Sequence, residues 1–492
     1  MHFKTLLTSL FLVCFFFQVI TQKENFSYLD VYDLQYASDP QISPNGEWIV
    51  YRRMKMDVMN DRSIGNLWMI RTDGSQHQKL TSREQSESSP RWSPNSDRLA
   101  FISNTDEGSE IYMFWVASGK IARISQLPFN PSSLTWSPAG DQLAFSMYQE
   151  KKPPVIAKMP KKPKGAKWAD EPRITDRVYH EADGRGYLKP GFSHIYVIPA
   201  NGGAPRQLTS GDYHHRGKLS WSPEGKNIFF SANRNEDWEY DFRNSEIYSV
   251  HVHNKEIKVL SERKGPDSNP LVSPNGKHIA YIGYDDQVQT YQVRKLYVMN
   301  FDGSGKKVIS GNLDRSVSNI VWDHKGEGVF FTYTDKGNSK VGHIGLNGKL
   351  SKIADDLGGT TIGRPYSSGS FSVSKDGTVV YTKSRPEHPA ELAVVKPKSK
   401  SPIRITNLNK ALLDFRNLGK VEEVWYKSSV DQRDIQGWIV YPPDYDATRK
   451  YPFMIENHGG PILNYGDRFS VEMQLYAAAG YIVFYPNARG ST

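Results

Sequence analysis

The residues with the clearest chemical potential are His458, Gly459, Gly460 and Pro461, which end the apolar segment YPFMIENHGGP. A strand that ends in two glycines can turn a backbone N–H toward a reacting carbonyl, and an oxyanion hole needs such a donor. The same residues are also compatible with a simple exit from a strand. We therefore treat the turn as a candidate oxyanion site and keep both interpretations.

The nucleophile that such a turn would serve is missing from the sequence. Acyl transfer on an α/β-hydrolase fold needs a serine on a Gly-x-Ser-x-Gly elbow, followed along the chain by an acid and a histidine. No Gly-x-Ser-x-Gly occurs in the 492 residues. We expect no catalytic residue of this class within the chain.

Metal-dependent chemistry finds little support. The pattern His-Glu-x-x-His is absent, and the HEADG segment at His180 lacks a second histidine at helical spacing. The pair His214-His215 is expected to lie in a loop. The only cysteine, Cys14, falls in the N-terminal apolar run and leaves no thiol nucleophile for a mature protein. The sequence predicts neither a metal nor a cofactor.

The elements that would position the turn begin with an internal repeat. Its core is an apolar residue, Ser-Pro, a short turn and an apolar strand, and it recurs about every 50 residues with one insertion. Five clear copies and two weaker ones begin at Ile42, Trp92, Trp136, Trp221, Val272, Trp322 and Val373. A second alternating phrase, such as EIYMFWVASGKIARIS, follows each hairpin, so each unit predicts four short strands.

Seven such units predict a seven-bladed β-propeller over about 27–407. Asn45-Gly46 and Asn275-Gly276 are strong hairpin signals because both turn positions can take positive φ. The tryptophans and tyrosines that recur at equivalent positions are expected to pack between blades. An insertion at about 149–191 interrupts the repeat, and it is either functional or a decoration. Its basic, proline-rich part, Lys151 to Trp168, is expected to be an exposed loop.

A different pattern begins after the last repeat. Four apolar or alternating runs lie within 419–492, and the segment Phe469 to Gly480 between the last two has helical periodicity. This order predicts the first part of an α/β sheet, whose unpaired edge we expect near Tyr481 to Tyr485. The fold class is therefore mainly β, a seven-bladed propeller followed by the first part of an α/β sheet.

The N-terminal residues indicate the cellular location of the protein, and the charge distribution limits the kinds of partner it can have. Residues 1–22, with an apolar run from Leu6 to Ile20, predict a secretory signal peptide and no stable membrane span after its removal. A periplasmic or extracellular location follows. The 62 basic and 53 acidic residues are interleaved, which disfavours a nucleic-acid partner. The oligomeric state stays open.

The signal peptide, the seven-copy Ser-Pro-x-Gly propeller, RKYPFMIENHGGP and GYIVFYPNARGST together resemble the prolyl oligopeptidase family of serine peptidases, in its acylaminoacyl-peptidase and dipeptidyl-peptidase branch. The resemblance implies that residues 419–492 are the N-terminal, incomplete part of an α/β-hydrolase domain, and that a propeller covers the active site and limits substrates to short peptides. Since the serine elbow of the family is absent, we expect the chain to be a fragment whose triad lies beyond Thr492. It also implies that the Gly460 backbone serves the oxyanion hole, with His458 and Gly459 shaping the turn.

Substrate specificity stays open between exopeptidase and endopeptidase. Dipeptidyl specificity would need acidic side chains that grip a free N-terminus, and candidates in the insertion are Asp170, Glu171, Glu181 and Asp183. The main alternative function is a non-enzymatic envelope propeller that acts as a binding or scaffold module. An esterase on the same hydrolase fold is a third possibility, which the propeller lid makes less fitting.

Overall fold

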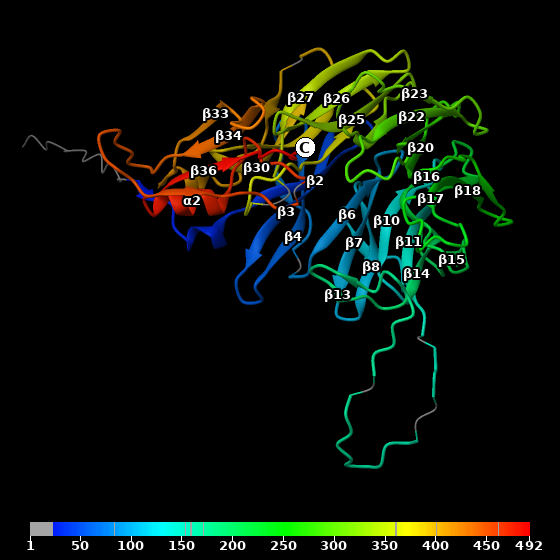
Figure 1. Ribbon diagram of the computed structural model, residues 1–492. Helices are drawn as coiled ribbons and strands as arrows, with labels where there is room; N and C mark the ends of the chain where they lie inside the picture. Colours follow the sequence, from blue (N-terminus) through cyan, green and yellow to red (C-terminus); the bar gives the residue numbers. More distant parts are fainter. Residues whose placement is uncertain are drawn as a thin grey trace, which may run out of the picture.

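The computed structural model describes residues 23–492 apart from 83, 153, 158–159, 171, 360–361, 400 and 461. The predicted signal peptide, 1–22, lies outside the described residues. Within them, the chain forms a ring of antiparallel sheets and a smaller mixed sheet near the C-terminus (Figure 1). None of the helices in this part of the chain has the length and apolar character needed to cross a lipid bilayer.

The ring contains seven four-stranded units, called blades 1 to 7 below, which confirms the predicted seven-bladed propeller. Blades 6 and 7 are joined into one sheet where Leu357 pairs with Lys383. Blades 1 to 3 consist of β2 (Tyr36–Ile42), β3 (Trp48–Asp57), β4 (Arg62–Arg71) and β5 (Gln78–Lys79); β6 (Glu87–Trp92), β7 (Arg98–Thr105), β8 (Gly108–Trp115) and β9 (Ile121–Arg123); and β10 (Pro131–Trp136), β11 (Gln142–Glu150), β14 (Gly191–Pro199) and β15 (Arg206–Gln207).

Blades 4 to 7 follow the same order. They consist of β16 (Arg216–Trp221), β17 (Asn227–Ala232), β18 (Glu246–His251) and β19 (Ile257–Val259); β20 (Asp267–Val272), β21 (His278–Gly283), β22 (Lys295–Asn300) and β23 (Lys307–Val308); β24 (Ser318–Trp322), β25 (Gly328–Asp335), β26 (Asn338–Gly345) and β27 (Leu350–Leu357); and β28 (Phe371–Val373), β29 (Val379–Arg385), β30 (His388–Val395) and β31 (Ile403–Arg404).

The two ends of the ring meet through contacts between blades 1 and 7 rather than through a shared strand. The N–H of Lys375 donates to the carbonyl of Pro44 at 3.1 Å. The N–H of Ile42 donates to Ser372 Oγ at 2.8 Å. Apolar side chains from β2, β3, β29 and β30 form one buried cluster across the same seam. Side-chain packing therefore carries much of the ring closure.

Each Ser-Pro-x-Gly segment is a tight turn in which the serine carbonyl and the serine hydroxyl each accept a backbone N–H from the residues that follow. In the copy that begins at Ser273, the N–H of Gly276 donates to the Ser273 carbonyl at 2.9 Å. The buried Ser273 hydroxyl accepts the N–H of His278 at 3.0 Å. The same hydroxyl bond recurs at Ser43, Ser93, Ser137 and Ser222. The repeated serine thus satisfies a strand N–H at each turn.

The conformation of these turns differs from the predicted one. We expected positive φ at both turn positions, but only the glycine has it, at 77° in Gly46 and 70° in Gly276. The reason is the proline before the asparagine. Proline holds φ near about −65°, which starts a type I turn, and the glycine then takes the left-handed position alone.

Gly276 should therefore resist substitution. An added Cβ would lie 3.3 Å from Pro223 Cγ in addition to the strain of positive φ. We expect Gly276→Val to destabilise the propeller by about 1 kcal/mol or more, measured by urea denaturation. Gly311→Val is the control, because Gly311 has no positive φ and open space at its Cβ position. Equal midpoints for the two variants would contradict this account of the turn.

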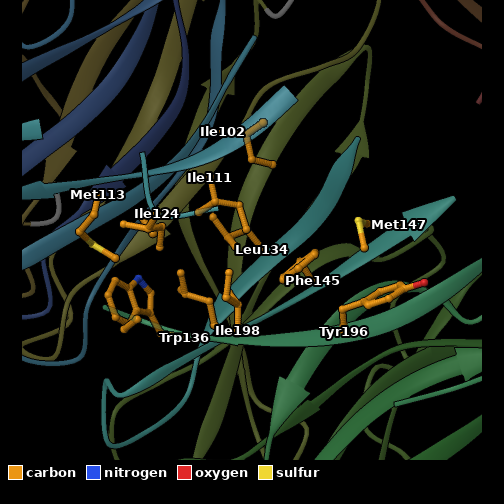
Figure 2. Close-up of a cluster of buried hydrophobic side chains, with 13 residues drawn as sticks. Ile102, Ile111, Met113, Ile124, Leu134, Trp136, Phe145, Met147, Tyr196 and Ile198 are labelled. Carbon is orange, nitrogen blue, oxygen red and sulfur yellow. The ribbon is translucent and has the colours of Figure 1, made fainter. Parts of the chain in front are cut away.

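The recurring tryptophans join neighbouring blades, as expected. The indole N–H of Trp92 donates to the Gln41 carbonyl, and that of Trp136 to the Arg91 carbonyl, each at 2.9 Å. Trp136 also belongs to the buried cluster between blades 2 and 3 that Figure 2 shows, where it lies beside Ile198 and Ile124. The indoles of Trp92 and Trp136 thus combine apolar burial with a satisfied donor, whereas the buried indole N–H of Trp221 has no acceptor among the described residues.

The segment after blade 7 begins with α1 (Lys410–Leu413) and β32 (Arg416–Asn417), which pairs in parallel with β1 (Glu24–Asn25), just before η1 (Asp30–Asp33). Next come β33 (Val421–Lys427), β34 (Asp434–Val440), β35 (Phe453–Ile455), α2 (Val471–Ala478) and β36 (Ile482–Pro486), called the C-terminal unit below. Ser470 caps α2 by accepting the N–H of Met473, and Gly480, with φ of 92°, follows its end. The predicted helix is present and shorter at both ends.

The predicted edge of this sheet was wrong. The strand order is β33-β34-β36-β35, so β36 is paired on both sides and Tyr485 is buried. The crossover through α2 places β36 between β34 and β35. The edge strands are β33 and β35, and at β35 Phe453 and Ile455 are 58% and 54% exposed. This edge can accept one further parallel strand.

The C-terminal unit docks on the β25–β26 turn of blade 6. The buried guanidinium of Arg468 donates to the Gly337 carbonyl at 3.1 Å and to the Leu357 carbonyl at 3.0 and 3.2 Å. Asn464 Nδ2 donates to the same Gly337 carbonyl at 3.1 Å. The buried ring of Trp438 lies against Gly337, since a Cβ there would come within 2.6 Å of it.

Gly337→Ala should loosen this docking. The added methyl group would meet Trp438 at 2.6 Å and the Tyr465 carbonyl at 2.9 Å. We expect faster cleavage by a protease between blade 7 and the C-terminal unit, together with a lower melting temperature. Gly348→Ala is a matched control, because Gly348 also has positive φ but its nearest neighbour is 3.5 Å away. The same protection in both variants would argue against the contact.

Candidate active site

The predicted oxyanion turn lies at the carboxyl end of β35 and is anchored by its histidine. His458 Nε2 lies 2.7 Å from Ser491 Oγ, in the turn after β36. The His458 ring also packs edge-on against Tyr465, with 5.2 Å between ring centres. Tyr465 is fully buried. The turns that follow two neighbouring parallel strands are thereby held together.

The glycines of this turn present free donors. Gly459 and Gly460 are both exposed, and within the described part of the chain neither N–H donates to a protein acceptor. Gly460 has a φ of 127°, and a Cβ on it would lie 2.8 Å from the Ile462 N. Gly459 has open space at its Cβ position. The turn therefore requires glycine at 460 and leaves its N–H groups available to a ligand.

The contact between Ser491 and His458 was not anticipated from the sequence. The Ser491 hydroxyl also lies 2.6 Å from the Ala488 carbonyl, and His458 Nδ1 lies 3.0 Å from the Gly459 carbonyl. No carboxylate of the described residues bonds to His458. Ser491 lies in a turn and not on a strand-to-helix elbow, so we interpret this pair as structural.

A cavity of about 580 Å³ lies between this turn and the propeller. Its wall on the C-terminal unit includes Ile462 and Leu463, which follow the glycine pair. Its propeller wall includes the β21–β22 connection and the inner strand β24, where Asn319 has a positive φ of 50° at a bulge. Bulges recur in the inner strands of blades 1 to 6. Sequence reasoning missed these bulges. The available signal was a Ser-x-Pro segment just before a repeat, as in Ser-Asp-Pro, Ser-Ser-Pro and Ser-Asn-Pro.

The acidic residues proposed in the insertion lie apart from the glycine turn in this structure. Asp170, Glu181 and Asp183 are exposed, and the last two flank the small hairpin of β12 (Glu181–Ala182) and β13 (Gly186–Tyr187). Glu171 lies outside the described residues. Figure 1 shows the insertion as a long loop that projects beyond blade 3. The structure does not bring these carboxylates together with His458.

The insertion nevertheless leaves the propeller on the relevant face. It joins the second and third strands of blade 3, as the β25–β26 turn does in blade 6. Equivalent connections of a propeller lie on one face. The β25–β26 turn contacts the C-terminal unit, so the insertion starts from the face on which that unit docks.

A group of buried histidines supports the base of the insertion. His214, expected in a loop, packs among the rings of Tyr148, Phe192 and Trp238. Burial, followed by Arg216 and Arg177, lowers the pKa of His214 to about 4. Burial, followed by Arg234, lowers the pKa of His215 to about 3. The described residues include no group of three or more potential ligands that could hold a metal.

These shifts predict acid sensitivity. An unfolded histidine binds a proton near pH 6.5, whereas His214 resists protonation down to about pH 4 when folded. The stabilisation of the folded state by neutral His214 is therefore fully present above pH 6.5. It is lost as the pH falls toward 4, because protonation of the unfolded chain then lowers the free energy of unfolding. We expect His214→Phe to lose less stability than wild type between pH 7 and pH 5, by urea denaturation. His253→Phe, at an exposed turn, is the control, and an unchanged pH dependence in His214→Phe would contradict this cause.

Comparisons with known proteins match this architecture. Residues 58–282 match the family model described as TolB beta propeller domain. The chain is 26% identical over 483 residues to dipeptidyl-peptidase 5 of Porphyromonas gingivalis, covering 93% of this chain and 67% of the relative. It is 23% identical to the uncharacterized peptidase YuxL of Bacillus subtilis, covering 94% and 70%.

Solved structures agree on the fold. Acylaminoacyl peptidase of Pyrococcus horikoshii superposes with a TM-score of 0.75 at 19% identity, covering 95% of this chain and 67% of that protein. An acylaminoacyl peptidase in complex with a chloromethyl ketone superposes with a TM-score of 0.73 at 20% identity. The chain thus spans about two thirds of the length of these proteins.

Proposed function

Because this chain belongs to the prolyl oligopeptidase family of serine peptidases, we propose that it forms the propeller and the oxyanion turn of an enzyme that hydrolyses short peptides. The reaction is acyl transfer through a Ser-His-Asp triad. The assigned parts are the propeller at 27–407 and the first part of the hydrolase domain at 419–492. The observation that carries the proposal is the pair of free N–H groups at Gly459 and Gly460, next to the cavity beneath the propeller.

In this mechanism the turn acts on the carbonyl oxygen. The N–H of Gly460 donates to the oxygen as negative charge develops on it during nucleophilic attack, and His458 and Gly459 hold the turn in shape. A donor that is stronger toward the transition state than toward the substrate lowers the barrier. The Ser491 contact to His458 keeps the turn from relaxing away from the cavity.

We propose that the nucleophile, its histidine and its aspartate lie in a part of the parent protein beyond Thr492. The open edge of β35 supports this arrangement, since a further parallel strand there would end beside the glycine turn. A serine on an elbow after that strand would then lie within reach of the Gly460 N–H. The greater length of the relatives is consistent with it.

The substrate class follows from the enclosure. A cavity of about 580 Å³ holds a few residues of a peptide, and the propeller above it excludes folded proteins. If the enzyme releases dipeptides, the carboxylates of Asp170, Glu171, Glu181 or Asp183 are the proposed binding site for the free N-terminus of the substrate.

We also propose export through a signal peptide at 1–22. The relatives named as peptidases favour peptide hydrolysis over the alternative function, a non-enzymatic scaffold propeller.

The labelling of a reactive serine tests the proposed division of the protein. The full-length parent should react with a serine-directed phosphonate and cleave short peptides, whereas the 492-residue chain should do neither. Labelling of the 492-residue chain would overturn the position proposed for the nucleophile. A full-length protein that neither labels nor cleaves peptides would overturn the function.

The glycine pair provides a matched test of the oxyanion donor. In the full-length enzyme, Gly460→Ala should lower kcat by roughly 10²-fold, because alanine cannot hold a φ of 127° and the donor would move. Gly459→Ala should retain kcat within about twofold, because its Cβ meets no atom within 4 Å. Equal kcat values for the two variants would remove Gly460 from the mechanism.

A further inference from the structure

We propose that the propeller wall of the cavity binds a carboxylate of the peptide substrate through Arg294 and Arg315. The proposal rests on the function proposed above and adds the charge of the preferred substrate. The shared chemistry is a carboxylate, which either the C-terminus of a short peptide or an Asp or Glu side chain can supply.

The charge of the cavity is one-sided. Among the described residues that line it, Arg294 and Arg315 are the only ones with an ionisable side chain apart from the tyrosines. The rest of the lining is dominated by hydroxyl, amide and apolar side chains, including Tyr291, Ser316 and Leu463. A guanidinium forms two parallel hydrogen bonds with a carboxylate, so an anionic group is the natural complement of this wall.

Hydrogen bonds hold the two arginines beside each other. The N–H of Arg294 donates to Ser316 Oγ at 3.2 Å, and the N–H of Val317 donates to the Arg294 carbonyl at 2.9 Å. The Tyr291 hydroxyl bonds with the same Ser316 Oγ at 3.1 Å. The β21–β22 connection is thereby fastened to the segment that enters β24. A fixed backbone reduces the entropy lost when the arginines bind a ligand.

The two arginines differ in whether their guanidinium groups already form ion pairs within the protein. Arg315 forms ion pairs with Asp335 at 3.1 Å and with Asp314 at 3.6 Å, and Lys340 shares the Asp335 carboxylate at 2.7 Å, so the charges of these four groups balance. The exposed guanidinium of Arg294 has no ion-pair partner among the described residues. Arg294 is therefore the group best placed to gain a partner from the substrate.

The position of the pair relates the carboxylate to the scissile bond. Ile462 and Leu463 line the same cavity as the arginines and follow Gly460 by two and three residues. The Leu463 carbonyl also accepts the N–H of Thr492 at 3.0 Å, which holds this wall in place. A peptide whose carbonyl lies at the Gly460 N–H can thus extend its carboxylate toward the propeller wall.

The test uses the full-length enzyme and matched peptides. One pair of peptides differs only in a C-terminal carboxylate or carboxamide, and a second pair differs only in Glu or Gln at one position, with both C-termini amidated. We expect one carboxylate peptide to exceed its neutral partner in kcat/KM by roughly tenfold, mainly through KM. The pair that responds identifies the source of the carboxylate.

Variants assign the effect to the wall. Arg294→Gln should remove the preference by raising KM for the carboxylate peptide, with kcat and the neutral peptide unchanged. Arg294→Lys should retain part of it. Arg123→Gln, on the exposed outer strand β9, is the control and should behave as wild type. Cleavage of neutral peptides without any charge preference, or a preference that survives Arg294→Gln, would overturn this inference and leave the proposed function intact. Failure to cleave any peptide would overturn both.

Discussion

The burial of Arg468 is the constraint on which the arrangement of the two parts depends. Its side chain is 3% exposed, and burial lowers its pKa to about 10. A guanidinium out of water is costly unless its donors are satisfied. Here the acceptors are the carbonyls of Gly337 and Leu357, which both belong to blade 6. The C-terminal unit can therefore bury this charge only by docking on the propeller.

This docking positions the candidate site. Asn464 shares the Gly337 carbonyl with Arg468, and it lies directly after Leu463 in the cavity wall. The glycine turn is thus tied to the propeller through a few residues of backbone. The cavity exists only where the two parts meet, because its walls come from blades 5 to 7 and from the C-terminal unit. The candidate site is in this sense a property of the interface between the two parts.

The repeat could be predicted in number and not in detail. Seven copies of an apolar residue, Ser-Pro and a turn imply seven blades, because each copy marks one hairpin of a four-stranded unit. The hydrogen bonds that explain the repeated serine could not be predicted from the sequence, since the Ser273 hydroxyl accepts the N–H of His278 only after the hairpin has formed. The edge of the C-terminal sheet was wrong for a related reason. Chain order alone does not reveal that the strand after α2 inserts between two earlier strands.

The sequence by itself determined the strand pattern, the candidate turn at His458-Gly459-Gly460 and the absence of a serine elbow, because hydrophobic period and residue type act over a few neighbours. That Arg294, Arg315 and Leu463 line one cavity could be learned only from the folded chain. These relations join residues more than a hundred positions apart. Their distances follow from how the blades close and how the buried guanidinium of Arg468 finds its acceptors.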